Sequence, residues 1–247
     1  MEYGEYQVMR EAEERHFWFR GSRAVIFDWV DRAIAEMGAC RRAVDVGAGT
    51  GGVLAGLGER ADAWGVEYHE AGARFCAGRC LRVAQGRLPM LPFADDTFDL
   101  AVSLDVFEHI EDDIAAMAEV RRIVRPGGRL IATVPALQWL WSEHDEALHH
   151  HRRYERNEFD ARLRRAGFQI ERLSFYNATL LPPIAAVRMV GNIMRRVVGP
   201  GPAPSSDVSI PPAPINEALA ALFASERHML RRGRLPIGAS LIADLRA

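Results

Sequence analysis

The sequence predicts an α/β protein with a doubly wound, mostly parallel sheet. Short apolar runs that fit strands alternate with segments of helical periodicity between residues 43 and 176. A glycine-rich turn at 47–52 joins the first apolar run to a helical segment, and Asp45 and Glu67 lie at the ends of the first two runs. Such sheets bind ligands beyond the carboxyl ends of their strands, so we expect the functional site at that edge.

The N-terminal residues 1–38 are expected to form a helical cap, because apolar positions recur there at helical spacing. Expected strands cover 43–46, 63–67, 81–85, 99–103, 129–134 and 168–175, and the helices between them cover 53–60, 71–80, 112–124 and 158–166. Residues 125–128 (Arg-Pro-Gly-Gly) are predicted to be a turn that reverses the chain.

The pattern changes after residue 176. Residues 178–198 are apolar with interspersed arginines, 199–214 are rich in Pro, Gly and Ser, 216–232 have amphipathic helical spacing, and 236–246 contain a last strand. We therefore expect one domain over 1–247, with a core at 43–176 and a helical insertion at 178–234. The insertion could be a lid over an apolar ligand or, through 178–198, a peripheral membrane contact. Pro182 and Pro183 argue against one long surface helix and favour the lid.

Composition excludes several classes of function. The net charge of −2 gives no electrostatic case for nucleic acid. All 31 basic residues are arginine, which excludes a Schiff-base lysine and a P-loop lysine. The three cysteines fit reduced structural thiols, and we expect no metal site, since the adjacent histidines at 149–151 cannot easily converge on one ion. Without an evident signal peptide or membrane span, a cytoplasmic location is expected.

The glycine loop by itself allows two kinds of cofactor. A G-x-G-x-x-G pattern at 47–52, with Glu67 about 20 residues on, fits dinucleotide-binding proteins. A G-x-G-x-G pattern at 47–51, preceded by Asp45, resembles that of methyltransferases that use S-adenosylmethionine (SAM). In both cases the free N–H groups at the helix start would face the ligand.

Three further segments decide between these cofactors: 91–99 (Leu-Pro-Phe-Ala-Asp-Asp-Thr-Phe-Asp), 103–110 (Ser-Leu-Asp-Val-Phe-Glu-His-Ile) and 124–128 (Val-Arg-Pro-Gly-Gly). Together with the glycine loop, in this order and spacing, they make residues 16–175 closely resemble class I SAM-dependent methyltransferases of the small-molecule type. The resemblance implies a Rossmann-like fold, SAM as cofactor, and a small-molecule or lipid-like methyl acceptor.

The resemblance also implies which residues bind SAM. Asp45 would shape the glycine loop, Glu67 would bind the ribose hydroxyls, and Arg23 would hold the carboxylate tail. The full expected set is Phe17, Trp18, Arg23, Asp45, Gly47, Ala48, Gly49, Glu67, Tyr68, Arg87, Leu88, Asp105, Val106 and His109.

Some of these assignments have open alternatives. Phe17 and Trp18 could face the sulfonium or form a packed aromatic cluster. Arg23 could be an ordinary charge on a helix surface. The family's adenine-binding acid is replaced here by Arg87, which cannot accept a hydrogen bond, so we expect backbone groups of Arg87 and Leu88, or ring stacking, to hold adenine.

Residues 139–154 are predicted to form the acceptor side. They resemble a subgroup of small-molecule methyltransferases with Trp-Ser-x-x-Asp followed by His-x-Arg-Arg-Tyr, in which His150 is the motif histidine. Imidazole titrates near working pH, so His150 is the expected base. The expected catalytic residues are His150, His144 and Tyr154, and the expected acceptor-binding residues are Trp141, Arg152 and Arg153. A purely structural role, in which this segment is fixed by hydrogen bonds, stays open.

Three functions remain after this reasoning. The first is a SAM-dependent methyltransferase, most simply acting at oxygen. The second is a NAD-dependent oxidoreductase, against which the missing lysine counts. The third is a catalytically silent SAM-binding protein.

Overall fold

A seven-stranded sheet forms the centre of the protein. The computed structural model describes residues 3–198 and 209–247. The strands are β1 (Arg42–Val46), β2 (Asp62–Glu67), β3 (Val83–Gln85), β4 (Phe98–Leu104), β5 (Val124–Pro135), β6 (Gln169–Tyr176) and β7 (Ser240–Arg246). Their order is β3-β2-β1-β4-β5-β7-β6, and only β7 pairs antiparallel with its neighbours. The predicted doubly wound, mostly parallel α/β fold is confirmed.

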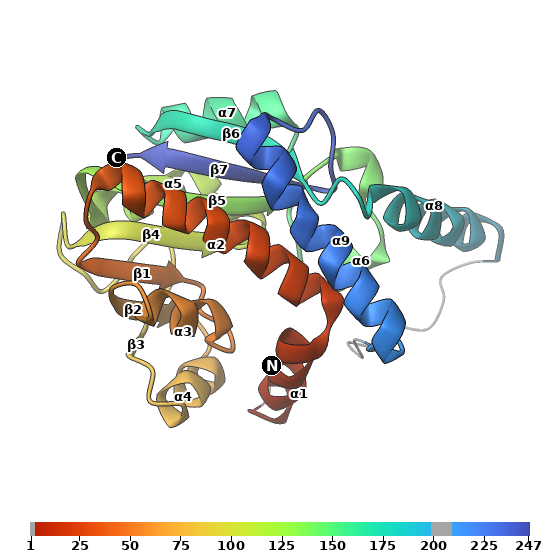
Figure 1. Ribbon diagram of the computed structural model, residues 1–247, viewed down its shortest axis with the longest axis horizontal. Coiled ribbons are helices and arrows are strands. Elements are labelled where there is room, and N and C mark those ends of the chain that lie inside the picture. Colours follow the sequence, from red (N-terminus) through yellow and green to blue (C-terminus); the bar gives the residue numbers. More distant parts are fainter. Residues whose placement is uncertain (1–2, 199–208) are drawn as a thin grey trace.

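Helices cover the sheet in two layers (Figure 1). They are α1 (Tyr3–Arg15), α2 (Phe17–Met37), α3 (Gly52–Gly58), α4 (Glu70–Gly78), α5 (Asp113–Ile123), α6 (Glu143–Ala147), α7 (Arg156–Arg165), α8 (Leu181–Val198) and α9 (Ala213–Arg232), with short 3-10 turns η1 (Phe107–His109) and η2 (Gln138–Leu140). The expected N-terminal helical cap consists of two helices, α1 and α2. His16 separates them, since its ring accepts a hydrogen bond from the Trp18 amide and caps α2.

The segment 125–128 does not reverse the chain as predicted. β5 runs without interruption from Val124 to Pro135, and its register with β4 shifts between Phe98 and Leu100. The extra residues bulge out of the ladder at Gly127, whose φ of +77° suits glycine. Proline and two glycines therefore mark a bulge here, after which the same strand continues.

The insertion consists of two helices with different surroundings. α8 is a continuous helix that begins at Leu181, so Pro182 and Pro183 occupy its first turn, where proline is tolerated. The argument from these prolines against a long helix is therefore wrong. α9 lies along α2 and crosses the sheet with it, whereas α8 extends away from the sheet (Figure 1). Residues 199–208 of the predicted linker lie outside the described residues.

The core is apolar on both faces of the central strands. Val44, Leu100, Ile131 and Leu241, one from each of β1, β4, β5 and β7, are fully buried. Burial on both faces explains why these strands read as apolar runs in the sequence. Among the described residues, no helix is both long and apolar enough to cross a membrane.

Candidate cofactor and acceptor site

The glycine loop follows β1 at the carboxyl edge of the sheet. Gly47, Gly49 and Gly51 have φ values of +88°, +52° and +78°, a region that L side chains rarely adopt. A Cβ on Gly47 would lie 2.5 Å from the Cγ2 atom of Val106. The loop therefore packs directly against the segment that follows β4.

Glu67 reaches the glycine loop from the end of β2. One carboxylate oxygen accepts a hydrogen bond from the Gly49 amide at 2.9 Å, and the other accepts one from the His69 amide at 2.9 Å. The side chain is buried, and the two backbone hydrogen bonds fix the orientation of its carboxylate. The predicted ribose-binding acid thus lies beside the loop that would cradle the rest of the nucleoside.

The α3 N-terminus is occupied by a carboxylate that sequence reasoning missed. Glu13 of α1 is buried, and it accepts hydrogen bonds from the Thr50 hydroxyl and from Arg10. It lies so close to the start of α3 that a Cβ on Gly52 would clash with it. Arg23 faces the same carboxylate, with Nη1 3.8 Å from it. A helix N-terminus beside an arginine is a suitable site for an anion.

Asp45 lies beneath this group of acids and is almost fully buried. Burial, together with the nearby Glu13 and Glu67, raises the pKa of Asp45 to about 7. The Leu54 amide, which donates a hydrogen bond to Asp45, only partly offsets this effect. Asp45 therefore titrates near neutral pH, and its hydrogen bond from Leu54 links the end of β1 to α3.

The remaining predicted cofactor residues are more scattered. Tyr68 and Arg87 are exposed, and the half-buried Leu88 follows Arg87 in the segment after β3. Gly86 donates its amide to the Glu67 carbonyl at 3.1 Å, which holds that segment beside β2. This placement is compatible with an adenine site formed by backbone groups.

Phe17 and Trp18 pack toward α9. The Trp18 ring lies 5.6 Å from that of Phe223, and the Phe17 amide donates to the Asn216 side chain at 2.9 Å. Both rings pack against the main core. The Trp18 ring thus belongs to an aromatic cluster with Phe223, while the Phe17 ring contacts that of His16 at 4.4 Å.

A histidine pair lies where the β4 and β5 edges meet. The rings of His109 and His150 are 4.6 Å apart and nearly perpendicular, at 82°. The His151 amide donates to the Glu108 carbonyl at 2.8 Å, which draws the segment after α6 against η1. Asp105, at φ +52°, precedes this turn and accepts a hydrogen bond from the Thr133 hydroxyl at 3.1 Å. The structure thus unites a predicted cofactor residue with the predicted base.

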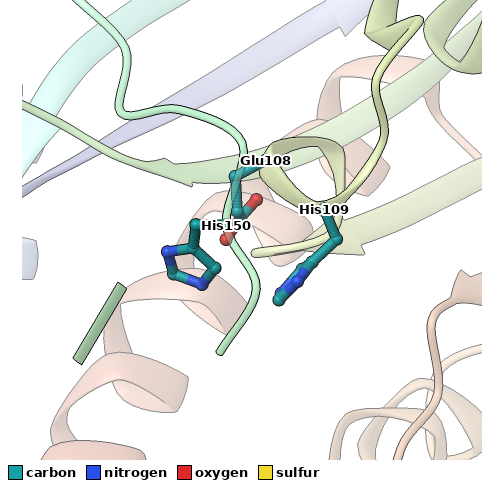
Figure 2. Close-up of side chains that lie close together, drawn as sticks. All are labelled: Glu108, His109 and His150. Atoms are coloured by element: carbon teal, nitrogen blue, oxygen red, sulfur yellow. The ribbon is translucent and has the colours of Figure 1, made fainter. Parts of the chain in front are cut away.

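Glu108 is the second residue that sequence reasoning missed. It is fully buried, and its carboxylate lies with His109 and His150 so that one ligand atom from each falls within 4.8 Å of the others. Figure 2 shows the three side chains directed toward a common space. The local sequence at 105–110 (Asp-Val-Phe-Glu-His-Ile) mixes apolar and charged residues, so it does not indicate which acidic side chain is buried.

Asp145 organises the predicted acceptor segment. It is fully buried, and it binds the His150 Nδ1 at 3.1 Å, the Arg153 Nε at 2.8 Å and the Arg188 Nη1 at 2.9 Å. It also caps α6 by accepting from Ser142. Although burial opposes this, the hydrogen bonds from His150 and Arg153 hold the pKa of Asp145 below its usual range.

Tyr154 and Arg152 form a separate structural cluster around Asp113. Tyr154 is fully buried, and its hydroxyl donates to Asp113 at 2.7 Å, while Arg152 lies 2.9 Å from the same carboxylate. Burial and the hydrogen bond to Asp113 raise the pKa of the Tyr154 phenol well above its usual range. Arg153 is likewise buried, with its guanidinium on Asp145 and the Ala136 carbonyl. The expected catalytic role of Tyr154 and acceptor-binding roles of Arg152 and Arg153 therefore do not fit these positions.

α8 closes over the rest of the acceptor segment. Arg188 donates to the Leu140 carbonyl at 2.7 Å, and Asn192 donates to the Trp141 carbonyl at 3.0 Å. His144, the alternative base, is exposed on α6. Trp141 thus contacts α8 through its backbone carbonyl, in the same segment, 139–154, that carries His150.

Comparison with known proteins identifies the family to which the sequence belongs. The family described as a methyltransferase domain matches residues 44–132, which include the glycine loop, Glu67 and the turn after β4. The chain belongs to the class I SAM-dependent methyltransferases. SAM is the methyl donor of this family.

Individual relatives agree with this assignment. The chain is 30% identical over 175 residues to a probable S-adenosylmethionine-dependent methyltransferase of Mycolicibacterium smegmatis, an alignment that covers 68% of the chain and 65% of that protein. It is 33% identical over 102 residues to a demethylmenaquinone methyltransferase of Mycolicibacterium paratuberculosis, covering 40% and 44%. The chain thus spans less than two thirds of the length of these two curated relatives.

Solved structures share the fold. A SAM-dependent methyltransferase of Thermotoga maritima, described as a possible histamine N-methyltransferase, superposes with a TM-score of 0.59 over 98% of the chain and 96% of that structure, at 18% identity. This similarity concerns the architecture alone.

Proposed function

We propose that this protein transfers a methyl group from SAM to a small-molecule or lipid-like acceptor, at an oxygen atom. The observation that carries the proposal is the contact between Gly47 and Val106. It brings the glycine loop against the turn that leads into Glu108 and His109, so a donor on the loop would present its methyl group toward the histidine pair.

The roles of the site residues follow from their positions. Glu67 would hold the ribose, the loop amides and Arg23 the aminocarboxylate, and the acceptor hydroxyl would enter beside His109 and His150. The sulfonium is already activated, so alignment of acceptor and methyl contributes most, up to about 7–11 kcal/mol. Removal of the hydroxyl proton at the histidine pair adds roughly 10²–10⁴-fold.

The surface of α8 supports an apolar acceptor. Its buried side anchors on the acceptor segment through Arg188, while Val187, Met189 and Val190 are exposed. Apolar side chains on the exposed surface of a helix that adjoins the site fit a lipid-like molecule or the membrane surface that carries it. Both roles expected for 178–198, lid and peripheral contact, remain compatible with this helix.

Calorimetric titration tests the cofactor, and mass spectrometry tests the acceptor. SAM should bind and NAD should not; NAD binding without SAM binding would favour the oxidoreductase alternative. Incubation with isotopically labelled SAM and separated small-molecule and lipid extracts should transfer label to an acceptor. SAM binding with no transfer to any fraction would favour the silent binding protein.

A further inference from the structure

We propose that Glu108, His109 and His150 bind a divalent transition-metal cation, of which Zn²⁺ is the probe chosen here. The evidence for the metal site consists of the positions of these three side chains. The further claim that the cation activates an acceptor hydroxyl rests on the proposed function.

The geometry suits one small cation. The three ligand atoms lie within 4.8 Å of one another. Zinc binds imidazole nitrogen and carboxylate oxygen at about 2.0–2.2 Å in a tetrahedral arrangement, so two of its ligands lie about 3.3–3.6 Å apart. The side chains would therefore move toward one another by up to about 1.5 Å to close on the cation. The perpendicular rings allow both imidazoles to direct a nitrogen toward the space that they share with Glu108 (Figure 2).

Both histidines are oriented as metal ligands usually are. The Nδ1 atom of His150 hydrogen-bonds to the Asp145 carboxylate, which leaves its Nε2 atom free for a cation. The ring of His109 donates to the Leu148 carbonyl, which likewise fixes one nitrogen and frees the other. A metal-binding imidazole almost always has such a carboxylate or carbonyl partner on its far nitrogen.

The charge balance of the cluster also favours a cation. Beyond the Glu108 amide itself, neither Glu108 oxygen has a hydrogen-bond partner within the part of the chain that the structure describes. Asp145 has Arg153 and Arg188 beside it, whereas no comparable ion pair reaches Glu108 among those residues. A buried carboxyl group without a partner is costly. A dication bound by one of these oxygens would compensate the buried charge of the ionised carboxylate.

The ligand types narrow the identity of the cation. Two imidazoles and one carboxylate suit zinc or iron, whereas magnesium and calcium prefer sites made of oxygen alone. His109 is exposed, so the cation can enter from solvent and keep open coordination positions on that side. The site therefore has the three protein ligands and free positions typical of a catalytic metal.

With a cation bound, the acceptor hydroxyl would not need a histidine base to lose its proton. An acceptor oxygen coordinated to it would have a lowered pKa and would release its proton to solvent. That oxygen then forms a bond to the methyl carbon of SAM while the carbon–sulfur bond breaks, and the sulfonium becomes a neutral thioether. His150 would be a ligand in this arrangement, not the base that the sequence suggested.

Equilibrium dialysis against Zn²⁺ with metal analysis tests the site, using the full chain after removal of metal by a chelator. The wild type should bind one Zn²⁺ at this site, and Asp145→Asn should weaken binding roughly 10–100-fold through the lost orientation of His150. His150→Ala and Glu108→Gln should weaken it at least as much. His151→Ala is the matched control, since it removes an adjacent exposed histidine outside the cluster, and it should bind as the wild type does.

Two results would overturn the proposal: no Zn²⁺ bound by the folded wild type, or unchanged affinity in both Glu108→Gln and His150→Ala. Circular dichroism checks the fold, and Glu108→Gln preserves the shape of the protonated acid if His150→Ala fails to fold. Parallel titration with SAM separates the proposals. SAM binding without Zn²⁺ binding overturns the metal site alone, and Zn²⁺ binding without SAM binding overturns the proposed function alone.

Discussion

The guanidinium of Arg23 donates to the backbone carbonyl of Glu13 at 2.8 Å, and its Nη1 atom lies 3.8 Å from the Glu13 carboxylate. The residue that we expect to bind the SAM carboxylate thus already faces a carboxylate of the chain. If Arg23 binds the SAM carboxylate as we propose, Glu13 lies where that carboxylate would bind, at the start of α3. Cofactor entry would therefore be linked to displacement of α1.

Arg23→Met should weaken SAM binding about 10–100-fold, because hydrogen bonds to charged groups contribute roughly 1.5–3 kcal/mol. Calorimetric titration measures the change. Arg32→Met is the matched control, since Arg32 lies on the same helix in an exposed pair with Glu36. Equal affinities of the two variants would place Arg23 outside the cofactor site.

Glu13→Ala should tighten SAM binding, by roughly 3–10-fold if the closed arrangement dominates in the free protein. The reason is that no internal carboxylate then needs to leave the α3 N-terminus. Glu14→Ala, at the neighbouring exposed position, serves as control. Weaker binding by Glu13→Ala would instead indicate that Glu13 contacts the amino group of SAM.

Glu67→Ala should reduce SAM affinity by about 100-fold or more, since two charge-assisted hydrogen bonds to the ribose would be lost. The change also frees the Gly49 and His69 amides, so thermal unfolding must be recorded alongside the titration. Glu70→Ala, on the exposed start of α4, is a suitable comparison. Retained affinity in folded Glu67→Ala would exclude Glu67 from the ribose site.

Asp45 should make the stability of the ligand-free protein depend on pH. Its pKa is about 7 in the folded state and near 3.8 when unfolded, so the folded state favours the protonated acid. The contribution of Asp45 to the free energy of unfolding is therefore fully present below about pH 4 and is lost as the pH rises through 7. The free energy of unfolding falls with pH by at most about 1.4 kcal/mol per pH unit from this group. Asp45→Asn should flatten this part of a stability profile obtained by urea unfolding at several pH values. An unchanged slope would contradict the assignment.

Tyr154→Phe should cost about 1–3 kcal/mol of unfolding free energy, because Asp113 loses a buried hydrogen bond. Urea unfolding measures this cost, and SAM affinity should not change. Tyr68→Phe alters an exposed tyrosine and should stay within about 0.5 kcal/mol of the wild type. A Tyr154→Phe variant as stable as the wild type would show that the bond to Asp113 contributes little.

The sequence predicted the elements whose local pattern matches their environment. Strands buried on both faces read as apolar runs, and the loop at 47–52 required glycine wherever φ is positive. Two local arguments failed for one reason: tertiary packing decided the outcome. Glycines at 127–128 bulge a strand without reversing it, and prolines at 182–183 start a helix. For Trp18 the sequence left two alternatives open, and the structure shows the aromatic packing on α9.

The site was harder to predict than the fold. Glu67 could be singled out because it ends a strand about 20 residues after the glycine loop, and His150 because its segment resembles a known methyltransferase motif. Glu13 and Glu108 could not, because their significance arises from contacts with Thr50 and with the histidine pair that form only when distant segments meet. A glutamate in a segment of mixed apolar and charged residues gives no sign that it will be buried without a partner.

The position of β7 has a consequence for synthesis. This strand lies between β5 and β6, so residues 169–176 leave the ribosome well before the strand that joins them to the sheet. Until residues 240–246 emerge, the β5 edge and β6 both carry unpaired backbone groups that invite pairing with other chains. Nascent chains stalled within the insertion should therefore be the species most dependent on chaperones.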